Sequence, residues 1–494
     1  MKKTNSLLIF LIIILLATYF RLAFIELAEF KGDEARDAFI AKDLIAEGKV
    51  PLVGAATMVG GNSGPLYYFL LALPFSISFN PIVASTFIAF LNIIAVIITY
   101  KFTKDFFNER IALITSALVA VSPFVILFSR KIWNPDLIFP FSTILLYSLY
   151  SVVLKKKAKF LISLFISLSF LIQIHAINLF LVPAVFIFLL KFRSVIKLKY
   201  LVTGLLLSIL IFSPFIYFEL TNNFKNTATL FSTFRLYQFN KINTIAIQHL
   251  ASLTSGSGFD YMLGSDSTSF NSSIFYVNKF FVVENLLLFF GIILIFYFAS
   301  RKTFSLNLKY SILLFWFTIP LLILLFFNGP LYPYHLIMLL PVNFLTIAIL
   351  IDFLLRKTEK LPLQQQLKFL IVFVLFAVLF VQISFDQAFL NLLNKNGGTK
   401  GLYEIGLKYK FELAKFVAEN SSQNFSISYT LKPNDIGIEY KYLLSLFNKT
   451  PSDLPVVQYV VINNLSPRLN TSELQSLSNY QKVNFGPLTV CIVR

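Results

Sequence analysis

About eleven long apolar runs, separated by short polar gaps, limit how this 494-residue chain can fold. A helix needs about 20 apolar residues to cross the hydrocarbon core of a bilayer, because its backbone amides must be satisfied within the segment. Only 13% of the residues are charged, against about a quarter in soluble proteins, so a water-soluble fold is excluded. The predicted spans are 7–27, 82–102, 111–129, 137–154, 160–175, 177–191, 199–218, 278–299, 310–327, 335–355 and 368–385.

Basic residues gather in alternate gaps between these spans, and this pattern accounts for most of the formal net charge of +18. The positive-inside rule places such gaps in the cytoplasm. The charge therefore indicates topology and gives no reason to expect a nucleic-acid partner. The clusters are Lys2 and Lys3; Lys101, Lys104 and Arg110; Lys155, Lys156, Lys157 and Lys159; Lys191, Arg193, Lys197 and Lys199; Arg301, Lys302 and Lys309; and Arg356, Lys357, Lys360 and Lys368.

The other gaps are then extracytoplasmic, and the odd number of spans puts the C-terminus on the same side. The chain is predicted to be a multi-pass protein of the plasma (cytoplasmic) membrane. Its first run is interpreted as a retained signal anchor, because it is too long for a signal peptide and no small-residue cleavage site follows. The predicted outer segments are 28–81, 130–136, 219–277, 328–334 and the tail from 386.

Two domains are expected: a transmembrane domain over 1–390, with large outer loops 28–81 and 219–277, and a small extracytoplasmic domain over 391–494. The fold class is thus an all-α polytopic membrane protein with a small C-terminal α/β domain. Short elements are predicted at 35–46 (amphipathic helix), 66–79 (apolar, too short to span), 402–419 (helix), 425–431 (strand), 436–447 (helix), 456–462 (strand) and 483–493 (strand).

The strongest candidate for chemistry is the run Lys31-Gly32-Asp33-Glu34-Ala35-Arg36-Asp37, directly after the first span. Asp33 and Glu34 are two adjacent carboxylates at the water boundary, and either could accept a proton from a hydroxyl at neutral pH. The simpler interpretation is a solvated helix start, where acidic residues favour the helix dipole. Composition alone favours the simpler interpretation.

A second charged run, Ser129-Arg130-Lys131-Ile132-Trp133-Asn134-Pro135-Asp136, lies in the next outer gap. Cations here break the charge asymmetry that orients the protein. A phosphate would explain Arg130, since a guanidinium pairs with phosphate oxygens at two points. Headgroup anchoring by Arg130, with Trp133 in the aromatic belt, is an equally good explanation.

Weaker signals lie at the outer ends of other spans, at Gln173, His175, Tyr334 and His335. Polar residues at membrane depth often mark a functional cavity, although a single interfacial histidine is more often structural. The histidines have no metal-ligand spacing, and there is no P-loop or dinucleotide-binding glycine pattern. No cofactor is expected, and a divalent metal is possible but not indicated.

In these residues the chain resembles the GT-C superfamily of glycosyltransferases, of the family 39 and family 83 type, which includes protein O-mannosyltransferases and lipid A aminoarabinose transferases. The resemblance rests on Gly32-Asp33-Glu34, on Gly64-Pro65-Leu66-Tyr67-Tyr68, on Ser129-Arg130 with Asp136, and on Gln173-Ile174-His175. It covers the first two thirds of the chain. Where many members have an Arg-Tyr pair near a late helix, this chain has Tyr334-His335.

The resemblance implies an inverting transfer of a sugar from a polyprenyl-phosphate donor to an extracytoplasmic lipid, glycan or protein acceptor. Asp33 would be the base, supported by Glu34. The cations that would neutralise the departing lipid phosphate are Arg130, Lys131 and Arg36. A substrate pocket would be lined by Tyr67, Asp136, Gln173, His175, Tyr334 and His335.

Two other functions fit a polytopic chain. An oligosaccharyltransferase usually carries a Trp-Trp-Asp motif in its tail, but Trp133 and Trp316 both lie in the membrane region. A lipid or sugar transporter or flippase, without transferase activity, usually shows inverted repeats and charged residues in the middle of its helices. The polar residues noted here collect at one face of the membrane instead.

Overall fold

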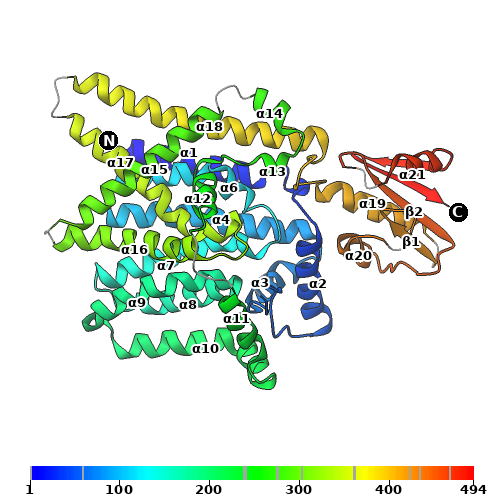
Figure 1. The fold of residues 1–494 in the computed structure, drawn as a ribbon, viewed down its shortest axis with the longest axis horizontal. Coiled ribbons are helices and arrows are strands. Elements are labelled where there is room, and N and C mark those ends of the chain that lie inside the picture. The colour runs from blue at the N-terminus through cyan, green and yellow to red at the C-terminus, as the bar shows by residue number, and fades with distance from the viewer. Residues whose placement is uncertain are drawn as a thin grey trace.

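The computed structural model describes residues 3–57, 60–236, 242–273, 277–301, 304–359, 363–421, 424–432, 435–466 and 469–493. Most of these residues form a bundle of elongated helices, and a small α/β domain lies at one end of it (Figure 1). The predicted fold class is therefore confirmed.

Eight helices in the described part of the chain are long and apolar enough to cross a membrane. The other three predicted spans fall on shorter helices. The bundle is built from α1 (Lys3–Leu22), α4 (Pro81–Phe106), α5 (Glu109–Ala120), α6 (Pro123–Leu127), α7 (Ile138–Val153), α8 (Phe160–Ile174), η3 (Ala176–Leu181), α9 (Val182–Lys191), η4 (Arg193–Val195), α10 (Leu198–Thr221), α15 (Val277–Ala299), α16 (Phe304–Phe326), η5 (Pro333–Leu339), α17 (Leu340–Thr358) and α18 (Gln364–Asn396).

The predicted continuous span 111–129 was wrong in one respect, because the chain breaks into α5 and α6. Pro123 is the first residue of α6 and has no backbone N–H to extend the helix before it. Ser122, at the break, is fully buried. Non-helical backbone is tolerated at membrane depth where protein surrounds it.

The bundle has a buried centre and a lipid-facing edge. In the span Pro333–Thr358, which joins η5 and α17, 94% of the most apolar window is buried within the protein, whereas in α10 only 6% is. Leu206 and Leu210 of α10 expose more than half of their side chains, which suits contact with hydrocarbon. The helix α17 is therefore the core of the bundle.

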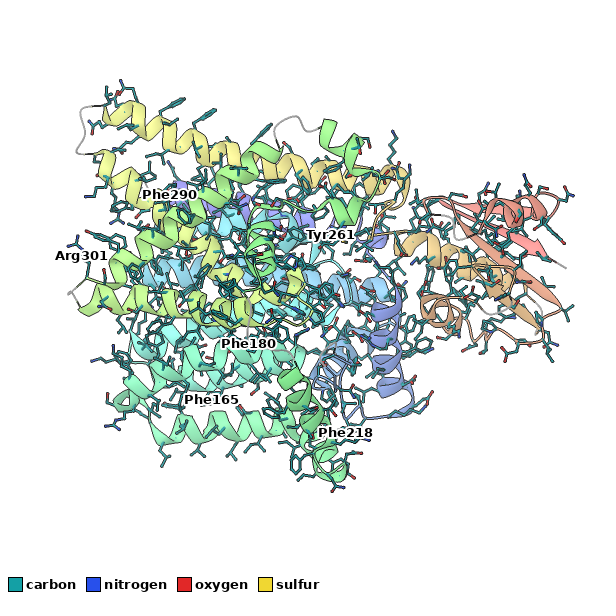
Figure 2. The ribbon with its side chains drawn as sticks, in the orientation of Figure 1. Phe165, Phe180, Phe218, Tyr261, Phe290 and Arg301 are labelled. Atoms are coloured by element: carbon teal, nitrogen blue, oxygen red, sulfur yellow. The ribbon has the colours of Figure 1, made fainter. Side chains whose placement is uncertain are left out.

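The two ends of the bundle differ in what they carry. The end next to the small domain, which we call the domain end, holds the outer segments η1 (Ile25–Leu27), α2 (Gly32–Glu47), α3 (Leu66–Phe75), η2 (Asn134–Leu137), α11 (Lys225–Leu236), α13 (Asp260–Leu263) and α14 (Ser267–Ser273). The helix α12 (Ile245–Ser255) lies nearer the middle of the bundle (Figure 1). The opposite end, the basic end, holds the predicted basic gaps; Figure 2 shows Arg301 there. Lys2, Lys302 and Lys360 lie outside the described residues.

The small domain contains a four-stranded sheet in the order β1-β2-β4-β3. The strand β1 is parallel to β2, and the other neighbours are antiparallel. The single predicted strand 483–493 was wrong: it is a hairpin, which turns at Gly486 with a φ of 52°. The elements are α19 (Leu407–Asn420), β1 (Phe425–Ser428), α20 (Ile438–Ser445), β2 (Val457–Asn463), α21 (Thr471–Ser476), β3 (Gln481–Phe485) and β4 (Leu488–Val493).

The domain packs directly on the first outer segment. The Leu407 amide donates to the Ala28 carbonyl over 2.9 Å, and the buried Lys410 ammonium donates to the Phe30 carbonyl over 2.9 Å. The Tyr442 hydroxyl donates to the Phe79 carbonyl over 2.7 Å. These contacts hold the segment just before α2, the helix that carries Asp33, and the segment just after α3.

Candidate functional site

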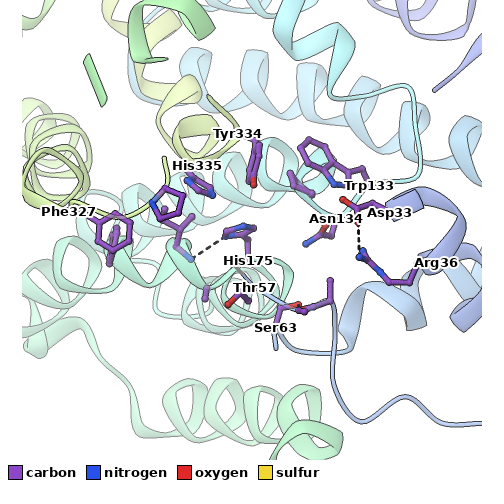
Figure 3. A pocket seen from close by; sticks show the side chains of 17 residues that line it. Asp33, Arg36, Thr57, Ser63, Trp133, Asn134, His175, Phe327, Tyr334 and His335 are labelled. Atoms are coloured by element: carbon purple, nitrogen blue, oxygen red, sulfur yellow. Dashed lines mark hydrogen bonds and ion pairs between the residues drawn. The ribbon is translucent and has the colours of Figure 1, made fainter. Parts of the chain in front are cut away.

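Two cavities meet at the domain end of the bundle. The first, of ≈ 230 Å³, contains His175 and His335 in its wall and is called the His cavity. The second, of ≈ 480 Å³, is lined by Lys31 and Lys131 and is called the Lys cavity. The residues that line both are Asp33, Trp133 and Tyr334. Figure 3 shows Asp33 at one side of the His cavity and Phe327 at the other.

The start of α2 gives its two adjacent carboxylates different surroundings. Glu34 is at the third helical position, and its carboxylate accepts a hydrogen bond from the Lys31 amide over 3.1 Å. This capping contact turns Glu34 back toward the protein, where it is buried. Asp33 precedes it by one residue and leaves 58% of its side chain exposed. Asp33 is therefore the carboxylate of the pair that a ligand can reach.

Arg36 joins Asp33 to a second, buried carboxylate. Its Nη1 donates to Asp33 Oδ1 over 2.7 Å, while its Nε and Nη2 donate to Asp37 Oδ1 over 2.9 and 2.8 Å. Burial raises the pKa of Asp37 to about 7, although Arg36 opposes the shift. Burial alone would lower the pKa of Arg36, but the charges of Asp37 and Asp33 outweigh it and raise that pKa. Arg36 is thus a fixed cation beside Asp33.

In the wall of the Lys cavity, Lys131 joins two carboxylates, as Arg36 joins Asp33 and Asp37. Its ammonium lies 2.6 Å from Glu29 Oε2 and 3.2 Å from Glu34 Oε1, and 4.3 Å above the Trp133 ring. Burial disfavours the charged form of Glu29, but Lys131 and Lys31 outweigh it and lower the Glu29 pKa. Burial raises the pKa of Glu34, and Glu29 adds to that shift. These buried ion pairs join the loop that carries Lys131 to the segment that carries Glu29 and Glu34, and both segments line the Lys cavity.

Two imidazoles form the far wall of the His cavity. The Nδ1 atoms of His175 and His335 each accept a backbone hydrogen bond over 3.3 Å, from the amides of Ile177 and Tyr332. A neutral imidazole that accepts at Nδ1 carries its proton on Nε2. Both rings, 5.1 Å apart, therefore have a donor suited to a sugar hydroxyl or a phosphate oxygen. No cluster of three or more His, Cys, Asp or Glu residues that could hold a metal occurs in the described part of the chain.

Several residues predicted for the site line neither of these cavities. Arg130 is buried, and its guanidinium donates to the carbonyls of Phe20 and Ala23 over 2.6 Å each, at the end of α1. Asp136 is buried, with neither carboxylate oxygen hydrogen-bonded to a described residue. Tyr67 lies with Asp37 beside the smaller space behind α2.

Gln173 ties the first outer loop to the bundle. Its amide nitrogen donates to the Ile211 carbonyl over 2.6 Å, and its amide oxygen accepts from the Leu66 backbone N–H over 3.2 Å. A Cβ on Gly64 would lie only 2.4 Å from that oxygen, so glycine is needed for the close approach. The contacts of Gln173 are those of a residue that positions α3 rather than one that lines a cavity.

Two buried carboxylates, Glu29 and Asp37, were not among the residues predicted for the site. Glu29 lies two residues before the motif and Asp37 is its last residue, and both are buried in ion pairs. The signal available in the sequence was their spacing, since Asp33 and Asp37 lie four residues apart and share a helix face with Arg36 between them.

The family model described as "Dolichyl-phosphate-mannose-protein mannosyltransferase" matches residues 62–218, less than half of the chain. The match includes Gln173 and His175 but begins after Asp33. No curated protein matches the chain.

Solved structures with the same fold cover the chain almost completely. ArnT from Cupriavidus metallidurans bound to undecaprenyl phosphate has 9% identity and a TM-score of 0.58, over 99% of this chain and 98% of that one. The oligosaccharyltransferase from Archaeoglobus fulgidus in its apo form has 14% identity and a TM-score of 0.55, over 92% of this chain and 65% of that one. AglB from the same organism, with an inhibitory peptide and a dolichol-phosphate, has 12% identity and a TM-score of 0.51, over 91% and 64%.

At these identities the structures establish a shared fold, and the family model adds a sequence link over the first outer loop and the helices that follow it. The predicted resemblance to the GT-C superfamily is thereby confirmed. The assignment to the membrane glycosyltransferases is supported by the same findings.

Proposed function

We propose that this chain, a glycosyltransferase of the GT-C superfamily, moves a sugar from a polyprenyl-phosphate donor to an acceptor hydroxyl, with inversion and with Asp33 as the base. The observation that carries the proposal is the position of Asp33, an accessible carboxylate in the walls of two adjoining cavities. An inverting transfer needs an acceptor and a donor on opposite faces of the anomeric carbon. Two cavities that meet at one carboxylate suit that requirement.

In the proposed reaction Asp33 takes the proton of the acceptor hydroxyl while the hydroxyl oxygen attacks the anomeric carbon. The bond from that carbon to the phosphate oxygen breaks, and the phosphate leaves with the lipid. The negative charge that develops on the phosphate is met by Arg36 and by Lys131 and Lys31 in the walls of the cavities. Arg130 is not assigned to this step, because it lines neither cavity and its guanidinium donates to backbone carbonyls at the end of α1.

We also propose on which side of the membrane the site lies and which lipid carries the sugar. The basic gaps at the end opposite to Asp33 favour a cytoplasmic basic end, so the site and the small domain would be extracytoplasmic. The undecaprenyl phosphate and dolichol-phosphate in structures of this fold support a long-chain polyprenyl phosphate as the carrier here. The acceptor would be a lipid, a glycan or a protein of the cell surface.

The test is a comparison of cells that lack the gene with cells that express Asp33→Asn, Asp43→Asn or the unchanged chain. Asp43 lies on the same helix but lines neither cavity, so it is the matched control. Mass spectrometry of membrane glycolipids and surface proteins should show a product that Asp33→Asn reduces by about 10²-fold or more. Full product formation by Asp33→Asn, at normal expression and membrane insertion, would remove Asp33 from the role of base.

A further inference from the structure

A third cavity lies at the basic end, far from Asp33 along the bundle. It has a volume of ≈ 310 Å³, and its polar lining is contributed by Asn108, Lys309, Asp352 and Arg356. Phe107, Phe298 and Phe353 are among the aromatic residues that complete the wall. The lining comes from the α4–α5 connection and from α5, α15, α16 and α17, so the cavity is formed between helices.

The one carboxylate of this cavity is already satisfied. Asp352 is buried, and its oxygens accept from Asn108 Nδ2 over 3.1 Å and Arg110 Nη1 over 3.2 Å. Arg356 Nη2 lies 2.9 Å from Asp352 Oδ2. One negative charge is thus shared by two guanidinium groups before Lys309 is counted.

Lys309 adds a third cation to this group. Its ammonium lies 3.9 Å from the centre of the Phe107 ring and is half-buried in the cavity wall. Among the described residues, no carboxylate lies within ion-pair distance of it and no acceptor takes a hydrogen bond from it. The Phe107 and Tyr310 rings face this ammonium, but they take up none of its three N–H donors, which can therefore bind an acceptor that a ligand supplies.

We propose that this cavity binds the phosphate group of an anionic membrane lipid. The cations offer charge-assisted donors to phosphate oxygens, and the aromatic side chains offer apolar contact for the first part of the acyl chains. Basic pockets between transmembrane helices at the membrane boundary are sites of this kind. The proposal does not depend on the proposed transfer reaction, since none of these residues lines the cavities at Asp33.

Native mass spectrometry of the full chain, purified in detergent and incubated with either phosphatidylglycerol or phosphatidylcholine, tests the proposal. The unchanged protein should retain phosphatidylglycerol preferentially, and Lys309→Gln should lower that retention by about fivefold. Lys199→Gln removes the same charge at the same end, on an exposed side chain outside the cavity, and should leave retention unchanged. Equal retention of the two lipids, or equal losses in the two variants, would overturn the proposal.

A second experiment distinguishes binding of a lipid phosphate from binding of free inorganic phosphate. Inorganic phosphate at 10 mM should not displace phosphatidylglycerol, because it lacks the acyl chains that reach the aromatic wall; displacement would mean that the site takes the free anion instead. Arg356→Gln, which alters an exposed side chain of the cavity, serves if Lys309→Gln does not fold. It should also lower retention of phosphatidylglycerol, and unchanged retention would contradict the proposal.

Discussion

The bundle has a cluster of charged residues at each end, and the two clusters have opposite balances of charge. At the domain end, carboxylates outnumber cations in the two cavities and the side chains bound to them. At the basic end, three cations surround Asp352. The members at the domain end are Glu29, Asp33, Glu34 and Asp37 with Lys31, Arg36 and Lys131. At the domain end Asp33 shares its only cation, Arg36, with Asp37, so its carboxylate can act as a base. At the basic end the excess of cations favours binding of an anionic ligand.

Burial also separates the two clusters. Glu29, Glu34, Asp37 and Lys131 are buried, whereas at the basic end Asp352 is buried but its partners Arg110 and Arg356 expose 44% and 60% of their side chains. Breaking a buried ion pair leaves an uncompensated charge away from water. Breaking an exposed pair changes little, because water and salt replace the lost partner. The domain end is therefore expected to be rigid and sensitive to substitution, and the basic end tolerant.

The largest expected effect comes from Lys131→Met, which leaves the buried Glu34 without its ion-pair partner and Glu29 with Lys31 alone. We expect a loss of about 3–5 kcal/mol in the free energy of unfolding. The matched change Arg356→Met at the basic end should cost at most about 1 kcal/mol. Unfolding of the purified proteins in detergent, followed by circular dichroism against denaturant, measures both.

The double variant Lys131→Met/Glu29→Gln serves as a control for the first prediction. It removes the carboxylate charge next to the unpaired Glu34 and should recover part of the lost free energy. If Lys131→Met and Arg356→Met cost the same, the contrast between a buried and an exposed cluster would be wrong.

The architecture could be predicted from the sequence because lipid demands long apolar helices, and the run lengths and basic gaps are directly visible. The errors arose where a single residue decides the local path. Pro123 interrupts what reads as one apolar run, and Gly486 turns what reads as one strand. The shorter helices, such as α8, were found because their apolar runs lie between basic clusters.

The site was less predictable, because charge and position in the chain do not tell which way a side chain points. Asp33 and Arg130 both follow an apolar span, yet one lines two cavities and the other donates to backbone carbonyls of Phe20 and Ala23. The partners of Arg130 are more than 100 residues away in the chain. Such contacts depend on how α1 packs, which no local motif encodes.

An intermediate effect is expected from the pH dependence of transfer at the domain end. Burial raises the pKa of Asp37 to about 7. Below that pH Asp37 is protonated, so Arg36 is paired with Asp33 alone and holds that carboxylate away from an acceptor hydroxyl. Above it Asp37 is charged and shares Arg36. Transfer should therefore rise with pH through about 7.

The variant Asp37→Asn imitates the protonated state at every pH. We expect activity about tenfold below that of the unchanged protein at pH 8, with no inflection near pH 7, because a hydrogen bond to a charged group is worth about 1.5 kcal/mol or more and Asp37→Asn no longer competes for Arg36. Initial rates of product formation from pH 5.5 to 8.5 provide the measurement. An inflection that persists in Asp37→Asn would assign the titration to another group.

The smallest expected effect, and the sharpest contrast between the two ends, is the response to salt. Screening acts over about 10 Å at 0.1 M and about 3 Å at 1 M ionic strength, and it acts mainly on exposed charges. Raising sodium chloride from 0.1 to 1 M should therefore lower retention of phosphatidylglycerol at the basic end by about two- to threefold, since Arg110 and Arg356 are exposed. The buried contacts of Lys131 are shielded from the added ions, so the denaturation midpoint difference between Lys131→Met and the unchanged protein should stay the same. A salt response of equal size at both ends would show that the buried cluster is open to solvent, and the contrast would fail.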